Sequence, residues 1–312
     1  MTDQQTFIFH HKSVSPYSEK IRLMLGYTNL FWLSVEAPLT PPRPSIDPLL
    51  DGYRRIPVAQ LGADIFCDTR IIAAEIAELS GNEKLNPFFQ SQEEWQWSEY
   101  IENDVFHFSL NSLHPLGLIR ALLSQVPLRQ LPNYLADKKH LFRNSNPELT
   151  AAAPDRARSK ALWQRYLDKL ETRLLKDFLN GSAPTYADFC AVHLIWFRMG
   201  MEGRVLFKGR PQLEKWYQKM ISFSHGRSAD ITPFNAITSA KNNQPRSIDT
   251  SMTQGSLIGK RVSVATTDIL LGDTQGCLVG EDNERWILAR DTEVAGRVHV
   301  HFPKATYQIT TL

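Results

Sequence analysis

The sequence has few cysteines and no long hydrophobic run, and each shortage excludes a class of protein. Only three cysteines, Cys67, Cys190 and Cys277, occur among 312 residues. Because they are far apart and odd in number, they argue against a disulfide framework and against a clustered zinc site. No apolar stretch approaches the length of a bilayer span, and the polar first residues do not resemble a signal peptide. We therefore expect a cytoplasmic, reduced protein that does not associate with membranes.

A charge excess of one sign is also missing. The chain carries 35 basic and 33 acidic residues, which gives a formal net charge of +2, and these residues are spread along the sequence. Nucleic-acid binding requires concentrated positive charge, so we expect no nucleic-acid partner. The hydrophobic fraction of 42% is typical of a soluble globular protein, and the length allows two or three domains.

Residues 1–82 alternate strand and helix signals and predict an α/β domain. The helix after the first strand is expected to stop at Gly26. The expected order is strand 6–10, helix 16–25, strand 30–35, a hairpin with strands 57–61 and 65–67, and a helix ending near Gly81.

The rest of the chain changes character twice. Residues 91–224 have helical periodicity throughout and predict an all-α domain, with one helix stopping near Gly181. Residues 225–254 are rich in Ser, Thr, Asn, Gln and Pro, which is typical of a linker. Residues 255–312 hold short strands separated by turn signals and predict a small all-β, barrel-like module. Because that module has little core of its own, we expect it to dock onto the helical domain.

A Ser-Pro-Tyr-Ser turn follows the first predicted strand, at residues 15–18. It has the form of a redox Cys-Pro-Tyr-Cys site whose sulfurs are replaced by hydroxyls, so it cannot store electrons and offers only hydrogen bonds. Ser15 is a good helix N-cap and Pro16 suits the first helical position. Capping alone is therefore one complete explanation of Ser15.

Three further motifs follow the Ser-Pro-Tyr-Ser turn in a fixed order. They are Ile56-Pro57-Val58, Asp68-Thr69 and the capping-box pattern Thr185-Tyr186-Ala187-Asp188. Together with the change to helical periodicity, the set resembles the glutathione transferase family over about residues 6–223. This resemblance implies a thioredoxin-like N-terminal domain, a helical C-terminal domain, glutathione as co-substrate and a homodimer.

The resemblance also assigns roles to individual residues. Ile56-Pro57 matches a cis-proline whose preceding residue pairs with the cysteinyl backbone of glutathione. Asp68 would face the ammonium of the γ-glutamyl group, and Thr69 with its helix N-terminus would hold the carboxylate. Ser15 falls where the family contacts the glutathione sulfur and would donate a hydrogen bond to the thiolate. A plain helix-capping role for Asp68 and Thr69 stays open.

Further candidates are less specific. Ser18 is a second hydroxyl that could instead bond its own backbone, and Ser13 lies in the same loop. The proline-rich stretch 38–48 replaces a helix that commonly contacts the glycyl carboxylate. The possible substitutes are Arg43, Arg54 and Arg55, of which Arg55 is carried forward as a glutathione contact.

The electrophile would lie between the two domains, facing Ser15, and the helix after residue 91 offers Trp95, Asp104, His107 and Phe108 toward it. An apolar or aromatic electrophile is expected there. His299 and His301 share one strand face, but two histidines without a third ligand make a poor zinc site, so no metal is expected.

The sequence therefore predicts a glutathione transferase whose bound glutathione thiol attacks an electrophilic carbon. Two alternatives remain. One is a glutathione-transferase-like protein used for binding or assembly, with the β module as its working part. The other is a specialised glutathione-dependent isomerase, dehalogenase or ether-cleaving enzyme, which would share the same glutathione site.

Overall fold

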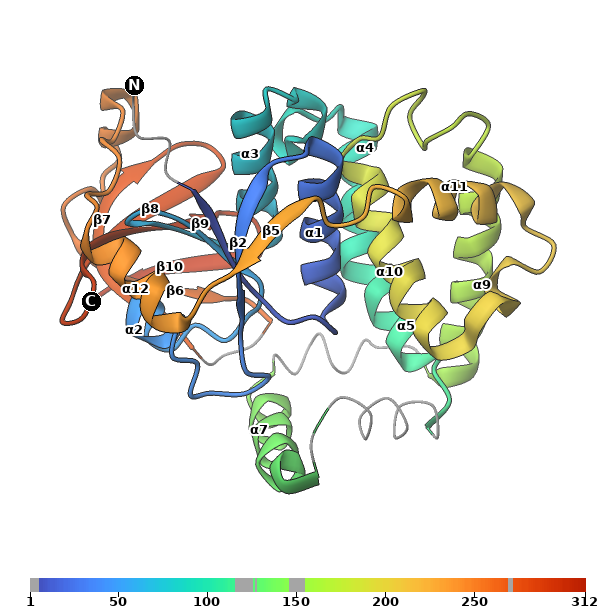
Figure 1. Ribbon diagram of the computed structural model, residues 1–312, viewed down its shortest axis with the longest axis horizontal. Coiled ribbons are helices and arrows are strands. Elements are labelled where there is room, and N and C mark those ends of the chain that lie inside the picture. Colours follow the sequence, from blue (N-terminus) through green and yellow to red (C-terminus); the bar gives the residue numbers. More distant parts are fainter. Residues whose placement is uncertain (1–5, 116–125, 127, 146–154, 269–271) are drawn as a thin grey trace.

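The computed structural model describes residues 6–115, 126, 128–145, 155–268 and 272–312. Its N-terminal part is an α/β unit with the predicted βαβ and ββα order (Figure 1). The elements of this unit are β1 (Phe7–His11), α1 (Pro16–Thr28), β2 (Phe31–Glu36), α2 (Asp47–Leu50), β3 (Val58–Leu61), β4 (Asp64–Cys67) and α3 (Thr69–Ser80). All five residues of β1 are buried, because helices cover both faces of the sheet.

The second part is helical, as predicted. Its helices are α4 (Gln92–Glu99), α5 (Phe106–Asn111), α7 (Leu131–Arg143), α9 (Arg156–Arg173), α10 (Tyr186–Glu202) and α11 (Pro211–Ile221), with a π-helical segment Tyr100–Val105 between α4 and α5. The expected helix stop near Gly181 is wrong, since α9 ends at Arg173. Helix α10 begins with the predicted capping box between Thr185 and Asp188. No helix among the described residues is long and apolar enough to cross a bilayer.

One sheet joins the first and last parts of the chain. The C-terminal strands are β5 (Arg227–Asp230), β6 (Arg261–Thr266), β7 (Thr274–Glu281), β8 (Arg285–Thr292), β9 (Gly296–Pro303) and β10 (Tyr307–Thr311). The strand order is β10-β6-β7-β8-β9-β4-β3-β1-β2-β5. The predicted all-β module is therefore present, and its strand β9 pairs in parallel with β4.

This arrangement corrects two expectations. The β module does not dock onto the helical domain, because β9 continues the N-terminal sheet at β4, and Val300 and Phe302 share a core with Ile65. The polar stretch 225–254 is also more than a linker, because it contains β5, which pairs with β2, and helix α12 (Pro233–Lys241). The module thus extends the α/β unit, while α1 and α3 face the helical domain (Figure 1).

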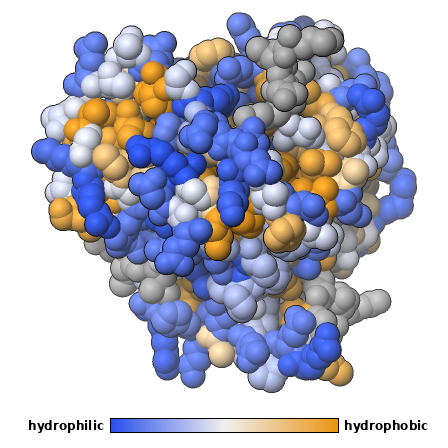
Figure 2. All heavy atoms as spheres, turned by 60° about the vertical axis from the view of Figure 1, so that its left-hand side comes forward, coloured by the Kyte–Doolittle hydropathy of each residue, from blue (hydrophilic) through white to orange (hydrophobic). Residues whose placement is uncertain are grey.

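The outer surface beside the module is mixed in character. Figure 2 shows hydrophobic residues there in separate patches divided by hydrophilic ones, and the lobe at the bottom is mainly hydrophilic. That lobe corresponds to α7, which lies below the rest of the molecule in Figure 1.

Gly26 lies inside α1, where it was expected to end the helix. Helix α1 continues to Thr28 and is closed by Asn29 in the left-handed conformation, with φ of 52°. A Cβ atom at position 26 would collide with the carbonyl oxygens of Phe223 and Ser224. The glycine therefore permits the chain after α11 to pass directly against α1.

This close approach reverses the usual effect of replacing a helical glycine. Gly→Ala in an open helix stabilises it by about 1 kcal/mol, but overpacking against backbone costs about 1–3 kcal/mol. We expect Gly26→Ala to lower the free energy of unfolding by about 2 kcal/mol in urea titrations. Gly200→Ala in α10 is the matched control, because nothing lies within 4 Å of its added Cβ, and it should be stabilising. Equal stabilisation by both variants would contradict the packing described.

The buried histidine of β1 makes stability depend on pH. Nε2 of His10 lies 3.0 Å from Oε1 of Gln60, and burial lowers the pKa of His10 from 6.5 to about 4, against the opposing effect of that hydrogen bond. Between pH 4 and pH 6.5, His10 is therefore mostly protonated in the unfolded chain and mostly neutral in the folded chain. This contribution to stability is therefore complete above pH 6.5 and is lost as the pH falls toward 4.

We expect His10→Gln to reduce the loss of stability between pH 7.5 and pH 4.5 by about 2–3 kcal/mol, since one pH unit of differential protonation corresponds to about 1.4 kcal/mol. Urea unfolding of both proteins at the two pH values checks this. Parallel pH dependence in the two proteins would mean that His10 titrates normally in the fold.

Candidate functional site

Three segments singled out in the sequence meet at one edge of the sheet. Strand β3 is antiparallel to both β1 and β4, and Val58 pairs with His10 on one side and with Cys67 on the other. The loop after β1, the residue before β3 and the residue after β4 therefore lie together. The strand register thus brings the Ser15 loop, Pro57 and Asp68 to the same place.

Ser15 is the N-cap of α1, as its residue type predicted. Its Oγ accepts a hydrogen bond from the backbone N–H of Ser18 at 3.3 Å, and its own N–H donates to the carbonyl of Lys12 at 3.0 Å. The hydroxyl proton is donated to none of the described residues, and the side chain is half-buried. Ser15 can therefore cap the helix and still donate one hydrogen bond to an anion at the helix N-terminus.

Ser18 is oriented differently. Its side chain is completely buried and its Oγ accepts from the N–H of Lys12 at 3.3 Å. Ser13 is exposed, and its hydroxyl donates to Glu36 at 3.0 Å. These contacts shape the loop before α1, which is the local backbone role that the sequence left open for Ser18.

The peptide bond between Ile56 and Pro57 is cis, as the resemblance implied. Pro57 is buried and Ile56 is half-buried. The backbone N–H and C=O of Ile56 have no hydrogen-bond partner among the residues that the structure describes. They can therefore pair with an extended peptide, in the manner of a strand edge.

Asp68 is the N-cap of α3, with a φ of 73°. Its Oδ1 accepts from the N–H of Arg70 at 3.0 Å, and its Oδ2 lies 3.4 Å from Nη1 of Arg55 and 3.4 Å from the hydroxyl of Tyr307. Burial tends to raise the pKa of Asp68, but the Arg70 and Arg55 guanidinium groups outweigh it, and the pKa is lowered. The carboxylate is therefore ionised and already surrounded by cations of the protein.

Thr69 begins α3, and its hydroxyl points to the domain interface. Its Oγ1 accepts from Nζ of Lys20 at 3.2 Å, and Lys20 is itself completely buried. The N–H of Thr69 has no partner among the described residues. An anion at this helix terminus would therefore meet the N–H of Thr69 and the helix dipole of α3, and the Thr69 hydroxyl can still donate its proton while its oxygen accepts from Lys20.

The three arginines considered for the glycyl carboxylate are separated by the structure. Arg43 is buried in its own loop with Asp47 and the carbonyl of Tyr53, and Arg54 pairs with Asp137 of α7. Arg55 stays beside Asp68 and also binds Asp268 of the β module at 2.6 Å. Only Arg55 of these three contacts the sheet edge that holds the other candidates.

Two domain-family models match the chain: the N-terminal domain of glutathione S-transferases at residues 9–84, and the C-terminal domain at residues 132–223. The chain belongs to the glutathione transferase family. A crystal structure of a GST-like protein from Pseudomonas syringae is similar over 99% of this chain and 100% of that one, with a TM-score of 0.75 and 27% identity. The glutathione transferase omega-1 of Caenorhabditis elegans is 26% identical over 187 residues, which cover 51% of this chain and 72% of the relative.

The side of this candidate site that faces the helical domain is aromatic. The ring of Tyr17, two residues after Ser15, lies 5.1 Å from the ring of Phe106 and 5.0 Å from that of His193. Phe108 is buried in the core, whereas Asp104 and His107 are exposed. Trp95 stacks under Arg70 at 6.0 Å.

Three residues of the site were missed from the sequence: Lys20, Arg70 and Tyr307. Arg70 directly follows the Asp68-Thr69 pair, so its place in the sequence could have indicated that it lies in the candidate site. Lys20 lies on the same helix as Ser15, but its partners Thr69, Glu102 and Tyr186 are 49 to 166 positions away. Tyr307 is 239 positions from Asp68. Only the three-dimensional fold could show these contacts.

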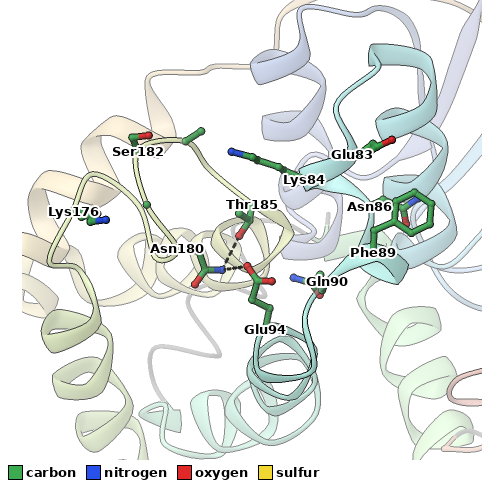
Figure 3. A pocket seen from close by; sticks show the side chains of 12 residues that line it. Glu83, Lys84, Asn86, Phe89, Gln90, Glu94, Lys176, Asn180, Ser182 and Thr185 are labelled. Carbon is green, nitrogen blue, oxygen red and sulfur yellow. Dashed lines mark hydrogen bonds between the residues drawn. The ribbon is translucent and has the colours of Figure 1, made fainter.

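A separate pocket lies at the other end of α3. It has a volume of about 340 Å³. Figure 3 shows Lys84, Gln90, Glu94 and Asn180 around it, with the side-chain amide of Asn180 bonded to Glu94 at 2.7 Å and to Thr185 at 3.1 Å. Because α3 has 12 residues and rises about 1.5 Å per residue, this pocket is about one helix length from Asp68 and is distinct from the sheet-edge site.

The described residues contain no group of three or more His, Cys, Asp or Glu side chains placed to hold a metal ion. Cys67, Cys190 and Cys277 are free thiols. Burial raises the pKa of Cys190 to about 12, so this thiol is protonated at neutral pH.

Proposed function

We propose that this protein binds glutathione at the sheet edge formed by the Ser15 loop, Ile56-Pro57 and Asp68-Thr69, and activates its thiol for attack on an apolar or aromatic electrophile. The observation that carries the proposal is the position of Ser15. Its hydroxyl stands at the N-terminus of a 13-residue helix with its proton uncommitted among the described residues, at the same end of the sheet as the backbone N–H and C=O of Ile56, which have no partner among those residues.

The hydrogen bond and helix N-terminus at Ser15 can supply the free energy that ionisation of the glutathione thiol requires. A thiol with a pKa of about 8.5 is only a few per cent ionised at neutral pH, and a decrease of two units requires about 2.7 kcal/mol. A hydrogen bond to a charged group contributes about 1.5–3 kcal/mol, and the helix N-terminus adds to it. The bound sulfur would then be a thiolate near Ser15, and the electrophile would lie over the ring of Tyr17.

Isothermal titration with glutathione, followed by turnover assays with 1-chloro-2,4-dinitrobenzene and a broader electrophile panel, tests the proposal. We expect saturable binding of one glutathione per chain and measurable conjugation. Product analysis then distinguishes simple conjugation from isomerase, dehalogenase or ether-cleaving chemistry. Absence of any binding at millimolar glutathione would refute the proposed function.

A second candidate is a binding or assembly protein built on the same fold. Its supporting observation is that Asp68 and Thr69, the expected γ-glutamyl contacts, already have protein partners in Arg55, Arg70 and Lys20. Glutathione binding without turnover over the whole electrophile panel would favour this candidate. A homodimer in the cytoplasm is proposed for either function, and light scattering after size exclusion tests the dimer.

A further inference from the structure

The β module reaches the proposed glutathione site because of the direction of its strands. Strand β9 is parallel to β4, so both strands end at the same edge of the sheet. The turn after β9 leads directly to Tyr307, which pairs with Thr266 at the end of β6. Asp268 lies two residues after Thr266. Two segments of the module therefore meet the edge where Asp68 follows β4.

The contacts at this junction are polar; Tyr307 and Asp68 are buried, whereas the Arg55 and Asp268 side chains are 29% and 38% exposed. The Tyr307 side chain is only 5% exposed, and its hydroxyl lies 3.0 Å from the hydroxyl of Tyr53 and 3.4 Å from Oδ2 of Asp68. The Arg55 guanidinium lies 5.5 Å from the centre of the Tyr307 ring. Nη2 of Arg55 donates to Oδ1 of Asp268 at 2.6 Å. The module thus contacts both Arg55 and Asp68.

Docking of the module does not require this polar cluster. The β4–β9 ladder and the shared apolar core already join the module to the α/β unit. Burying charged groups costs desolvation energy, and apolar residues at such positions are often as stable or more stable. A buried Tyr307-Asp68 pair, with the partly exposed Arg55 beside it, is therefore better explained by a role in the candidate site that it borders.

We propose that the C-terminal β module completes the glutathione site, with Tyr307 as the positioning residue that holds the paired Asp68 and Arg55 in place for glutathione. This inference rests on the proposed function. Tyr307 fixes Oδ2 of Asp68 through its hydroxyl, and its ring supports Arg55, whose other nitrogen is held by Asp268. Burial, followed by the charge of Asp68, raises the pKa of Tyr307, so the hydroxyl keeps its proton as a donor.

The test is glutathione titration of the full-length protein and its Tyr307→Phe variant. Removing the hydroxyl takes away one of the two donors to Asp68 Oδ2 and leaves only Arg55. We expect the dissociation constant for glutathione to rise about tenfold, which corresponds to the loss of one hydrogen bond to a charged group. In an Asp68→Asn background, Tyr307→Phe should change the constant less than twofold, because the two residues act through one contact.

Tyr53→Phe is the matched control, since it removes the other hydroxyl of the same pair and leaves the contact between Tyr307 and Asp68. It should bind glutathione within about twofold of the original protein, and thermal unfolding should show all variants folded. Unchanged affinity in Tyr307→Phe, equal losses in Tyr53→Phe and Tyr307→Phe, or a full tenfold effect in the Asp68→Asn background would overturn the inference. If the unmodified protein binds no glutathione, the proposed function fails as well, whereas binding with unchanged affinity in Tyr307→Phe defeats only this inference.

Discussion

Lys20→Met is expected to lower the free energy of unfolding by about 3–5 kcal/mol, because it leaves a buried carboxylate without its cation. Nζ of Lys20 donates to Oε1 of Glu102 at 3.1 Å, to the hydroxyl of Tyr186 at 2.7 Å and to Oγ1 of Thr69 at 3.2 Å. The Lys20 side chain is fully buried and that of Glu102 is 6% exposed. One ammonium therefore joins α1 and α3 to the helical domain.

Urea unfolding measures the change, and two further variants locate its cause. Lys20→Met combined with Glu102→Gln should recover a large part of the loss, since no buried charge is then left unpaired. Lys219→Met is the matched control: Lys219 makes an ion pair of 2.9 Å with Asp177 on the surface, and exposed pairs contribute little. If Lys20→Met were as mild as Lys219→Met, the buried interface described around Lys20 would be wrong.

Ser15→Ala is expected to reduce conjugation at neutral pH by about 10- to 100-fold while leaving the dissociation constant for glutathione nearly unchanged. In the proposed site, the hydroxyl would stabilise the thiolate by about 1.5–3 kcal/mol, which is typical of a hydrogen bond to a charged group. The peptide contacts proposed for glutathione do not involve this hydroxyl. Because a raised thiol pKa is overcome at alkaline pH, the deficit should shrink as the pH rises toward 9. The pH dependence of kcat/KM checks this.

Ser13→Ala is the control for that experiment. Ser13 lies in the same loop, but its hydroxyl donates to Glu36 at 3.0 Å, so conjugation should not change. Ser15→Ala also removes a helix cap, which costs about 1 kcal/mol of stability, and both variants should therefore be compared well below their unfolding temperatures. A pH-independent deficit, or none, would assign Ser15 to capping alone.

Local patterns predicted the elements that depend on neighbouring residues. The hairpin of β3 and β4, the Ser15 cap and the Thr185 capping box follow from turn and cap chemistry within a few positions. Elements that are stabilised by partners far away in the sequence could not be predicted from local patterns. Strand β5 is exposed at all four residues and pairs with β2 only through its backbone, so it left no hydrophobic pattern in the polar stretch 225–254.

The candidate site likewise has parts that the sequence could predict and contacts that it could not. The positions of Ser15, Pro57 and Asp68 follow from the order of the strands that carry them, because neighbouring antiparallel strands bring their connecting ends together. The contacts of Asp68 with Tyr307 and of Thr69 with Lys20 cross 239 and 49 positions. No periodicity connects residues so far apart, and the contact between the β module and Asp68 therefore emerged only from the structure.

A crystal structure of the protein with glutathione tests the central claim most directly. We predict the glutathione sulfur within hydrogen-bonding distance of Ser15 Oγ, the cysteinyl backbone paired with the N–H and C=O of Ile56, and the γ-glutamyl group at the N-terminus of α3 beside Asp68. Glutathione bound elsewhere, such as in the pocket at the far end of α3, or bound with its sulfur turned away from Ser15, would contradict this assignment.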